Sequence, residues 1–159
     1  MLKKTTEEFS TKQEGLTVLG LDISTSITGA TVTQDGEIKE SFFWDTRNKN
    51  KFPSLYHKAT FIKHKLLEIK DKFCIEGIYI EQSLHSFRSG FSSAQTLSTL
   101  SRFNGIVSWL CYDMFDIQPK MIAATSARKK AGVTIKRGDN AKEKVLQFVV
   151  DNYPNIEII

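Results

Sequence analysis

The sequence predicts an α/β fold in which a mixed five-stranded sheet, an antiparallel hairpin plus parallel strands, is flanked by helices. Three observations predict it. Residues 16–23 form a mostly apolar run that fits a strand buried on both faces. Asp35 and Gly36 form a tight-turn signal between two runs suited to strands. From Pro53 onward, helical periods alternate with short apolar runs, which indicates parallel strands joined by crossover helices.

The first part of the chain supplies the hairpin strands. Residues 16–23 are followed by residues 27–33, which are rich in Thr, Val and Ile, and residues 37–44 are predicted to pair with them across the turn. A helix then begins at Pro53 or Ser54. Its apolar stripe steps by three and four residues through Leu55, Ala59, Ile62, Leu66, Ile69 and Phe73. His57 and His64 lie on this helix without other metal-binding side chains, so both are expected at the surface.

A second buried strand is predicted at residues 75–80, ending in Glu81, and a helix at about residues 92–114. The apolar stripe of this helix is Leu97, Leu100, Val107, Leu110 and Met114. Beside it runs a stripe of small residues, Ala94, Ser98, Ser101, Gly105 and Ser108. Small residues allow another backbone to come close. We expect that backbone to be the sheet, and a helix of a second subunit is the alternative.

Residues 118–124 are predicted to be another strand, followed by a basic loop and a helix at about residues 139–152. Asp139 is the expected N-cap of that helix. Val145, Phe148 and Val149 are expected on its inner side, and residues 156–159 are a strand fragment or the start of a strand.

Length and composition predict one domain, residues 16–159, after a disordered lead-in at residues 1–15. The net charge of +4 mildly favours a polyanionic partner. No apolar run could span a membrane and no secretion signal is visible, so a cytoplasmic protein without a membrane partner is expected. Cys74 and Cys111 are expected to be buried free thiols.

Two carboxylates each end an apolar strand. If the strands of Asp22 and Glu81 are neighbours in a parallel sheet, both acids emerge at the edge where α/β sheets bind ligands. Two adjacent carboxylates repel each other unless a cation neutralises them, and oxygen ligands favour Mg²⁺ or Mn²⁺. This arrangement suits two-metal hydrolysis of a phosphodiester. The structural alternative is that Asp22 accepts backbone N–H bonds from the turn at residues 24–26.

Residues 120–144 hold eight basic residues against two acids, Asp139 and Glu143. The basic residues are Lys120, Arg128, Lys129, Lys130, Lys136, Arg137, Lys142 and Lys144. Gly132 and Gly138 place this loop before a helix N-terminus, an arrangement that favours phosphate binding over a merely solvated charge run. In the loop after Glu81, Phe87 is a candidate to stack on an unpaired base, with Arg88 beside it as a DNA contact. Packing of Phe87 or Phe91 under the next helix is the structural alternative, and the sequence favours it over stacking on a base.

The run Leu19-Gly-Leu-Asp-Ile-Ser-Thr-Ser-Ile-Thr-Gly29 resembles the first-strand motif of RuvC-type Holliday-junction resolvases, which belong to the RNase H-like superfamily. Ile80-Glu81-Gln82, placed 59 residues after Asp22, resembles the family's I-E-Q/E motif. Further similar segments are Arg102-Phe-Asn-Gly-Ile-Val, Ala123-Ala-Thr-Ser-Ala-Arg-Lys-Lys and Gly138-Asp-Asn-Ala-Lys142, so the resemblance covers residues 17–153.

The resemblance implies an RNase H-like fold and a Mg²⁺-dependent endonuclease that resolves Holliday junctions, acting as a homodimer on branched DNA. It implies Asp22 and Glu81 as metal ligands. It also implies Lys142, and one of Lys129 or Lys130, as lysines that contact phosphate near the cleaved bond. The family's paired aspartates on a final helix have no counterpart here, because Asp139, Glu143 and Asp151 precede that position. We therefore expect a domain truncated at its C-terminus.

Two other functions compete with this one. The first is a DNA-binding fragment of the same fold that lacks catalytic competence. The second is an actin-like ATP-binding phosphotransferase domain, whose phosphate loop also begins with Asp at a strand end. Its D-x-G motif is not met, because Ser24 stands where glycine is required. Cleavage of branched DNA with Mg²⁺ would support the nuclease, and ATP binding would support the phosphotransferase.

Overall fold

The computed structural model describes residues 15–82 and 93–159. Its elements in chain order are β1 (Thr17–Asp22), β2 (Ile27–Gln34), β3 (Glu37–Asp45), α1 (Leu55–Lys72), β4 (Gly77–Glu81), α2 (Ala94–Phe115), β5 (Lys120–Ile122), α3 (Ala124–Ala131) and α4 (Ala141–Asn152). The strands form a sheet with the order β3-β2-β1-β4-β5. β2 is antiparallel to β1 and β3, while β1, β4 and β5 are parallel, which confirms the predicted mixed five-stranded sheet.

This topology brings the ends of four strands to one side. Because β3 and β1 are both antiparallel to β2, they run in the same direction as β4 and β5. The last residues of β1, β3, β4 and β5 therefore share one edge, which we call the carboxyl edge. The Asp35–Gly36 turn of the hairpin lies at the opposite edge, and positive φ angles at both residues fit a tight turn between antiparallel strands.

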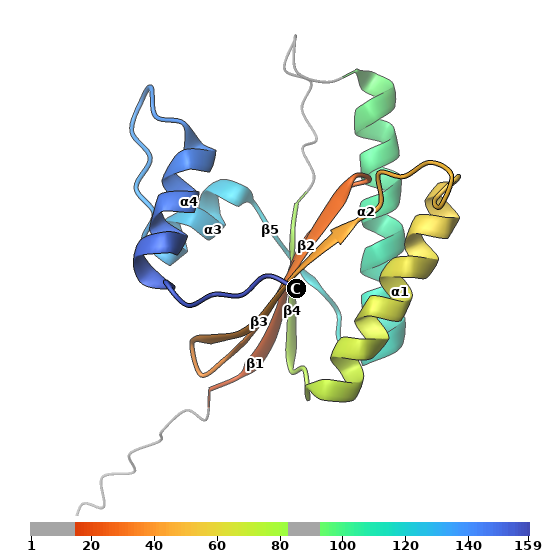
Figure 1. Cartoon of the computed structure of the whole chain (residues 1–159), viewed down its shortest axis with the longest axis horizontal. Helices are drawn as coiled ribbons and strands as arrows, with labels where there is room; N and C mark the ends of the chain where they lie inside the picture. The colour runs from red at the N-terminus through yellow and green to blue at the C-terminus, as the bar shows by residue number, and fades with distance from the viewer. Residues whose placement is uncertain (1–14, 83–92) are drawn as a thin grey trace, which may run out of the picture.

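The core lies between the sheet and the helices α1 and α2, which run side by side along one face (Figure 1). The predicted stripe of α1 is confirmed, because Ala59, Ile62, Leu66 and Ile69 are buried. Leu19, Val32 and Ile80 on the sheet are fully buried against this layer. The prediction that the first strand is buried on both faces is wrong: alternate residues of β1 are buried, and those between them are half-buried or exposed. The second face is covered less closely.

The small-residue stripe of α2 was predicted to pack on the sheet, but most of it is exposed. Ala94, Ser98, Ser101 and Gly105 are exposed, and a Cβ placed on Gly105 would meet no atom within 4 Å. The stripe therefore does not pack on the sheet, which corrects our expectation. The buried side of α2 is instead centred on Phe103, Asn104 and Val107, with Leu110, Cys111 and Met114 nearer its end.

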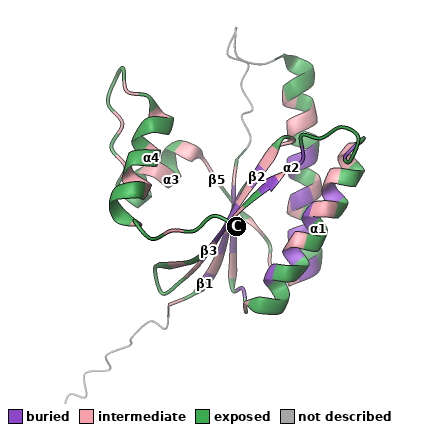
Figure 2. Cartoon of the chain, in the orientation of Figure 1, coloured by how far each residue is buried: buried purple, intermediate pink, exposed green. Residues whose placement is uncertain are grey.

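The chain after α2 is more helical and less buried than predicted. Strand β5 has only three residues, and the expected basic loop contains the helix α3. Neither α3 nor α4 has a buried residue, so the expected inner side chains Val145, Phe148 and Val149 are only half-buried (Figure 2). The N-cap of α4 is Asn140 rather than Asp139. Asp139 instead accepts a hydrogen bond from the Lys136 N–H at 2.8 Å, which closes the preceding loop.

The last residues of the chain lie beside β3. The predicted strand fragment at residues 156–159 is confirmed by a parallel bridge between Ser41 and Ile158. Cys74 is exposed, contrary to prediction, whereas Cys111 is buried and burial raises the pKa of its thiol to about 12. No helix of residues 15–82 or 93–159 is long and apolar enough to cross a membrane.

Candidate active site at the carboxyl edge of the sheet

Asp22 and Glu81 are the last residues of two neighbouring parallel strands, β1 and β4. Leu21 and Ile80 are paired in register immediately before them, so the two acids are adjacent across the strands. Parallel strands are about 4.8 Å apart. Because side chains alternate along a strand, both acids project from the face opposite to Leu21 and Ile80, away from α1 and α2. The structure therefore brings the two predicted carboxylates together.

The space beside Asp22 is left open by a glycine. Gly29 of β2 is the register partner of Asp22, and a Cβ added there would lie 4.0 Å from the Asp22 Cβ. A larger residue at this position would therefore fill room beside the carboxylate. Within the described part of the chain, neither the Asp22 nor the Glu81 carboxylate accepts a hydrogen bond or forms an ion pair.

The turn after β1 satisfies its own backbone groups. The Ser24 N–H donates to Thr28 Oγ1 at 3.4 Å, and the Ser26 N–H donates to Ser24 Oγ at 3.2 Å. These donors are therefore not directed at Asp22, and the structural alternative for this residue is wrong. The carboxylate oxygens are left free to bind a ligand.

The surroundings of both carboxyl groups disfavour their charged forms. Partial burial raises the pKa of Asp22, although Lys142 opposes the shift with its positive charge. Burial likewise raises the pKa of Glu81, the negative charge of Asp22 raises it further, and Arg128 lowers it. Asp22 is exposed as a residue, but enough protein surrounds its carboxyl group for desolvation to be the main cause. Such shifts are typical of sites that bind cations or transfer protons.

Of the basic residues predicted to contact DNA, one lies near the Asp22–Glu81 pair and the other described ones are exposed on α3 and in the following loop. Lys142, the second residue of α4, is near enough to influence Asp22. Lys129 and Lys130 are exposed on α3, and Lys136 and Arg137 are exposed in the following loop. Phe87 and Arg88 lie outside the described residues.

The predicted phosphate cradle at the N-terminus of α4 is already partly satisfied within the chain. Asn140 Oδ1 accepts hydrogen bonds from the Lys142 N–H at 3.1 Å and the Glu143 N–H at 3.5 Å. These two backbone donors are therefore engaged by the cap. The groups of this region that stay available to an anion are therefore mainly the side chains of the lysines and arginines.

Two residues at the site were not singled out from the sequence. Arg128 on α3, rather than Lys129 or Lys130, provides the positive charge that acts on Glu81. Asn104 is buried on α2, and its Nδ2 group donates to the Glu81 carbonyl oxygen at 3.4 Å. Asn104 thus connects the helix layer to the end of β4 and helps to position Glu81. The sequence signal that could have indicated this role is the position of Asn104, a polar residue on the apolar side of α2.

The donor set fits a divalent ion that keeps most of its water. Two free carboxylates on adjacent strands supply hard oxygen ligands, and Mg²⁺ commonly binds through one or two carboxylates plus water and substrate phosphate. Among residues 15–82 and 93–159 there is no group of three or more His, Cys, Asp or Glu side chains that could hold a metal ion. The pair is therefore compatible with Mg²⁺ or Mn²⁺ but supplies few ligands from the described protein.

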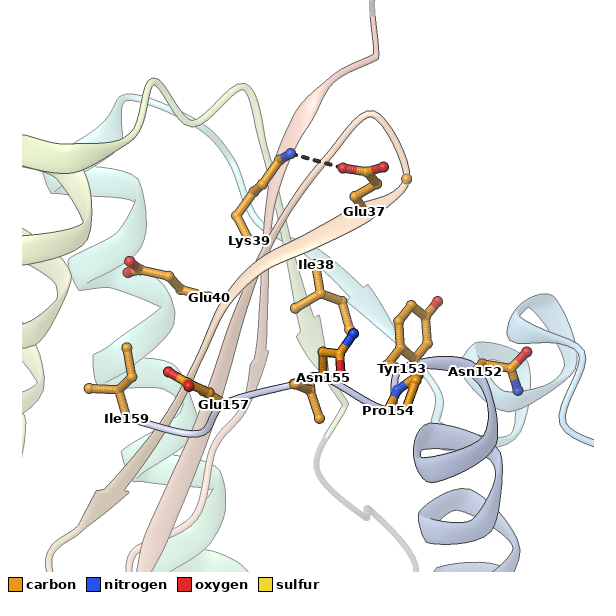
Figure 3. Close-up of a pocket in the computed structure, with 12 residues that line it drawn as sticks. Glu37, Ile38, Lys39, Glu40, Asn152, Tyr153, Pro154, Asn155, Glu157 and Ile159 are labelled. Carbon is orange, nitrogen blue, oxygen red and sulfur yellow. Dashed lines mark hydrogen bonds and ion pairs between the residues drawn. The ribbon is translucent and has the colours of Figure 1, made fainter.

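A cavity of about 590 Å³ is lined by the residues drawn in Figure 3, and neither Asp22 nor Glu81 is among them. It is formed by the start of β3 and the segment after α4, with Ile38, Tyr153 and Pro154 among its lining residues. It adjoins the hairpin turn, at the sheet edge opposite to the carboxyl edge. The cavity and the paired carboxylates are thus separate features.

The raised pKa values predict a stability cost at neutral pH. A carboxyl group whose pKa is higher in the folded state than in the unfolded state lowers the stability above its folded-state pKa, and this cost disappears as the pH falls below its unfolded-state pKa. Asp22→Asn is therefore expected to raise Tm at neutral pH without metal by roughly 1–3 °C. Thermal unfolding near pH 3, where carboxyl groups become protonated, should abolish the difference.

Added Mg²⁺ provides the control for this prediction. Binding to the folded state should stabilise the wild-type chain and reduce or reverse the advantage of Asp22→Asn. A variant that is less stable than wild type at neutral pH without metal would contradict the assigned environment of Asp22.

Comparisons of the structure with solved proteins identify its fold. The chain is similar to Thermus thermophilus RuvC in complex with a Holliday junction substrate, with a TM-score of 0.64 and 14% identity over 86% of this chain and 77% of RuvC. A second T. thermophilus RuvC structure gives a TM-score of 0.56 and 15% identity, covering 86% of this chain and 79% of that RuvC chain.

The yeast mitochondrial Holliday junction resolvase gives a TM-score of 0.52 and 13% identity, covering 89% of this chain and 63% of the resolvase. No protein-family model and no curated protein sequence matches the chain. At these low identities the structural similarity establishes the fold alone. The chain has the RNase H-like fold found in RuvC.

Proposed function

We propose that this chain is a divalent-metal-dependent endonuclease that binds branched DNA and hydrolyses a phosphodiester bond at the junction. The observation that carries the proposal is the pair of free carboxylates, Asp22 and Glu81, adjacent on β1 and β4 and near two basic side chains. Its fold is shared with a RuvC solved in complex with a Holliday junction substrate, which makes a four-way junction the first substrate to test.

The residues of the site divide into two roles. Asp22 and Glu81 would hold Mg²⁺ or Mn²⁺, which supplies activation of water and stabilisation of the leaving oxygen when bound. Lys142 and Arg128 carry the positive charges that act on these carboxylates, so both are suited to binding the phosphate next to them. Asn104 holds the end of β4 through the Glu81 carbonyl.

The direct test is incubation of the chain with a labelled four-way junction in Mg²⁺, with a linear duplex of the same sequence as the control. Metal-dependent nicks near the crossover support the proposal. The absence of binding and cutting would contradict it. Binding without cutting would support a second candidate, a DNA-binding domain with too few metal ligands, which the small acid set among the described residues favours.

The basic residues of α3, the following loop and the start of α4 are proposed to bind the DNA backbone. Lys129, Lys130 and Lys142 are exposed on these helices, as side chains that contact phosphates must be. The proposal also includes Lys136 and Arg137. Phe87 and Arg88, which precede α2, remain predicted junction contacts.

Changing Lys129, Lys130 and Lys142 together to Ala is expected to flatten the salt dependence of junction binding. Each lost phosphate contact removes about 0.9 from the slope of log K against log salt, so three contacts remove about 2.7. Fluorescence anisotropy at several salt concentrations measures this slope. An unchanged slope would show that these lysines form only a solvated surface.

We also propose that the chain forms a homodimer through the exposed side of α2. Trp109 is 58% exposed and Tyr112 is 51% exposed, and they continue the side on which Ser98, Ser101 and Gly105 leave the backbone accessible. A symmetric dimer would present two carboxylate sites to a four-way junction. Sedimentation equilibrium distinguishes the monomer from the dimer.

A further inference from the structure

A second basic surface lies on the other side of the carboxylates from α3 and α4. No acidic residue occurs between Asp45 and Glu68, whereas six lysines and arginines do. Four of them, Arg47, Lys49, Lys51 and Lys58, lie in the segment after β3 or in the first turns of α1. We call these four residues the β3–α1 basic surface.

The topology places this surface at the carboxyl edge. β3 ends at Asp45 on the same edge as Asp22 and Glu81, and it is separated from β1 only by β2. Neighbouring strands are about 4.8 Å apart, so the end of β3 lies roughly 10 Å from the end of β1. In Figure 1 the segment that joins β3 to α1 lies on one side of the sheet, and α3 and α4 lie on the other side.

Hydrogen bonds attach this segment to the turn that follows Asp22. The Thr46 N–H donates to the Ser26 carbonyl at 2.8 Å, and Thr46 Oγ1 donates to the Thr25 carbonyl at 3.1 Å. Lys58 Nζ also donates to the Thr25 carbonyl. Thr46 is only 1% exposed, so the attachment is buried. The basic surface is thus held at a defined position relative to Asp22.

The positive charges of this surface are poorly compensated within the chain. Arg47 pairs with Asp45 at 2.5 Å, but no ion pair in residues 15–82 or 93–159 involves Lys49, Lys51 or Lys58. Lys51 Nζ lies over the rings of Phe52 and Phe61, 5.4 and 5.7 Å from their centroids. Burial, with the nearby charge of Lys49, lowers the pKa of Lys58. Like charges held close together create a positive potential that favours an anionic partner.

We propose that the β3–α1 basic surface binds backbone phosphates of the DNA strand that enters the carboxylate site, beside the phosphate to be cleaved. This inference rests on the proposed function and adds a binding surface to it. Lys49 and Lys51 make the direct contacts, and Lys58 also positions the turn after Asp22.

The test compares two variants that each remove two positive charges. Lys49→Gln with Lys51→Gln changes the proposed surface while keeping much of the Lys51 stem on its aromatic neighbours. Lys39→Gln with Lys63→Gln is the matched control, because Lys39 lies near the hairpin turn and Lys63 lies in the middle of α1, both exposed. Binding of a four-way junction is measured in Ca²⁺ over a range of salt concentrations.

The Lys49/Lys51 variant is expected to lose about 1.8 from the salt slope, at about 0.9 for each phosphate contact, with little change in the control. Replacing individual phosphates on either side of the cleavage position by methylphosphonates should weaken wild-type binding at the contacted phosphates and leave binding by the variant unaffected at those positions. Circular dichroism and thermal unfolding exclude misfolding as the cause.

Each other outcome has a distinct meaning. Equal losses in the two variants would show a general effect of net charge and overturn the proposed surface. An unchanged slope in the Lys49/Lys51 variant, with wild-type binding intact, would overturn the surface while leaving the proposed function in place. Failure of the wild-type chain to bind any branched DNA would overturn both. Loss of binding to phosphatidylserine vesicles, with DNA binding unchanged, would assign the surface to a membrane lipid instead.

Discussion

Replacing Asp22 by Asn, or Glu81 by Gln, is expected to reduce Mg²⁺-dependent cleavage of a four-way junction by more than about 100-fold. Loss of a residue that only supports a metal ligand already costs 10–100-fold, so loss of a ligand itself should cost more. Each substitution removes one of the two adjacent carboxylates proposed to bind the metal and retains a side chain of similar size. Single-turnover cleavage with excess protein measures the chemical step without interference from product release.

Binding of the junction in Ca²⁺ should remain close to wild type in both variants, because the proposed phosphate contacts come from other residues. Asp71→Asn is a suitable control, since Asp71 is exposed near the end of α1, far along the helix from its start at the carboxyl edge. Cleavage at the wild-type rate by Asp22→Asn would contradict the assignment of the metal site. A matching loss in Asp71→Asn would show that the effect is not specific to the site.

Phe103→Ala is expected to lower the free energy of unfolding by about 3–5 kcal/mol, the usual cost of truncating a fully buried phenylalanine. Phe103 is a residue of α2, is 0% exposed and belongs to the hydrophobic core. Because net stabilities of domains are typically about 5–15 kcal/mol, this change removes a large part of the total. Chemical denaturation with urea measures it.

Trp109→Ala supplies the comparison on the same helix. Trp109 is another large aromatic residue of α2 but is 58% exposed, so its replacement in dilute protein should change the unfolding free energy by about 0.5 kcal/mol or less. Phe103→Leu, which retains much of the apolar volume, should fall between these two. Similar losses for Phe103→Ala and Trp109→Ala would contradict the observed orientation of α2.

The spacing of apolar residues predicted the elements in which buried residues recur at regular intervals. The stripe of α1 repeats over 18 residues, so both the helix and its buried side could be predicted from the sequence. The hairpin followed from Asp35 and Gly36, whose positive φ angles fit the turn. Helix α3 has only eight residues and none is buried, so no apolar stripe marked it. The choice of Asn140 over Asp139 as the cap depends on the loop geometry, because both residue types cap helices well.

The candidate site was predictable where it depended on strand ends. Asp22 and Glu81 each follow an apolar run, and parallel pairing of those runs is sufficient to bring them together. The role of Asn104 could not be predicted, because its hydrogen bond to the Glu81 carbonyl joins residues 23 positions apart in the chain. The sequence also could not show that Arg128, rather than Lys129 or Lys130, lies near Glu81. The orientation of α3 about its axis decides which basic side chain acts on Glu81. Because the sequence predicted a loop here, it gave no such orientation.

If the proposed function holds, the shallow packing of α3 and α4 couples their position to DNA binding. Since neither helix has a buried residue, their separation from the sheet exposes little apolar surface and requires less free energy than global unfolding. Separation would carry Arg128 and Lys142 away from Glu81 and Asp22, whereas a phosphate bound between them favours the closed arrangement. Closure and DNA binding would then form one linked equilibrium, in which the apparent affinity equals the intrinsic affinity multiplied by the fraction of closed molecules.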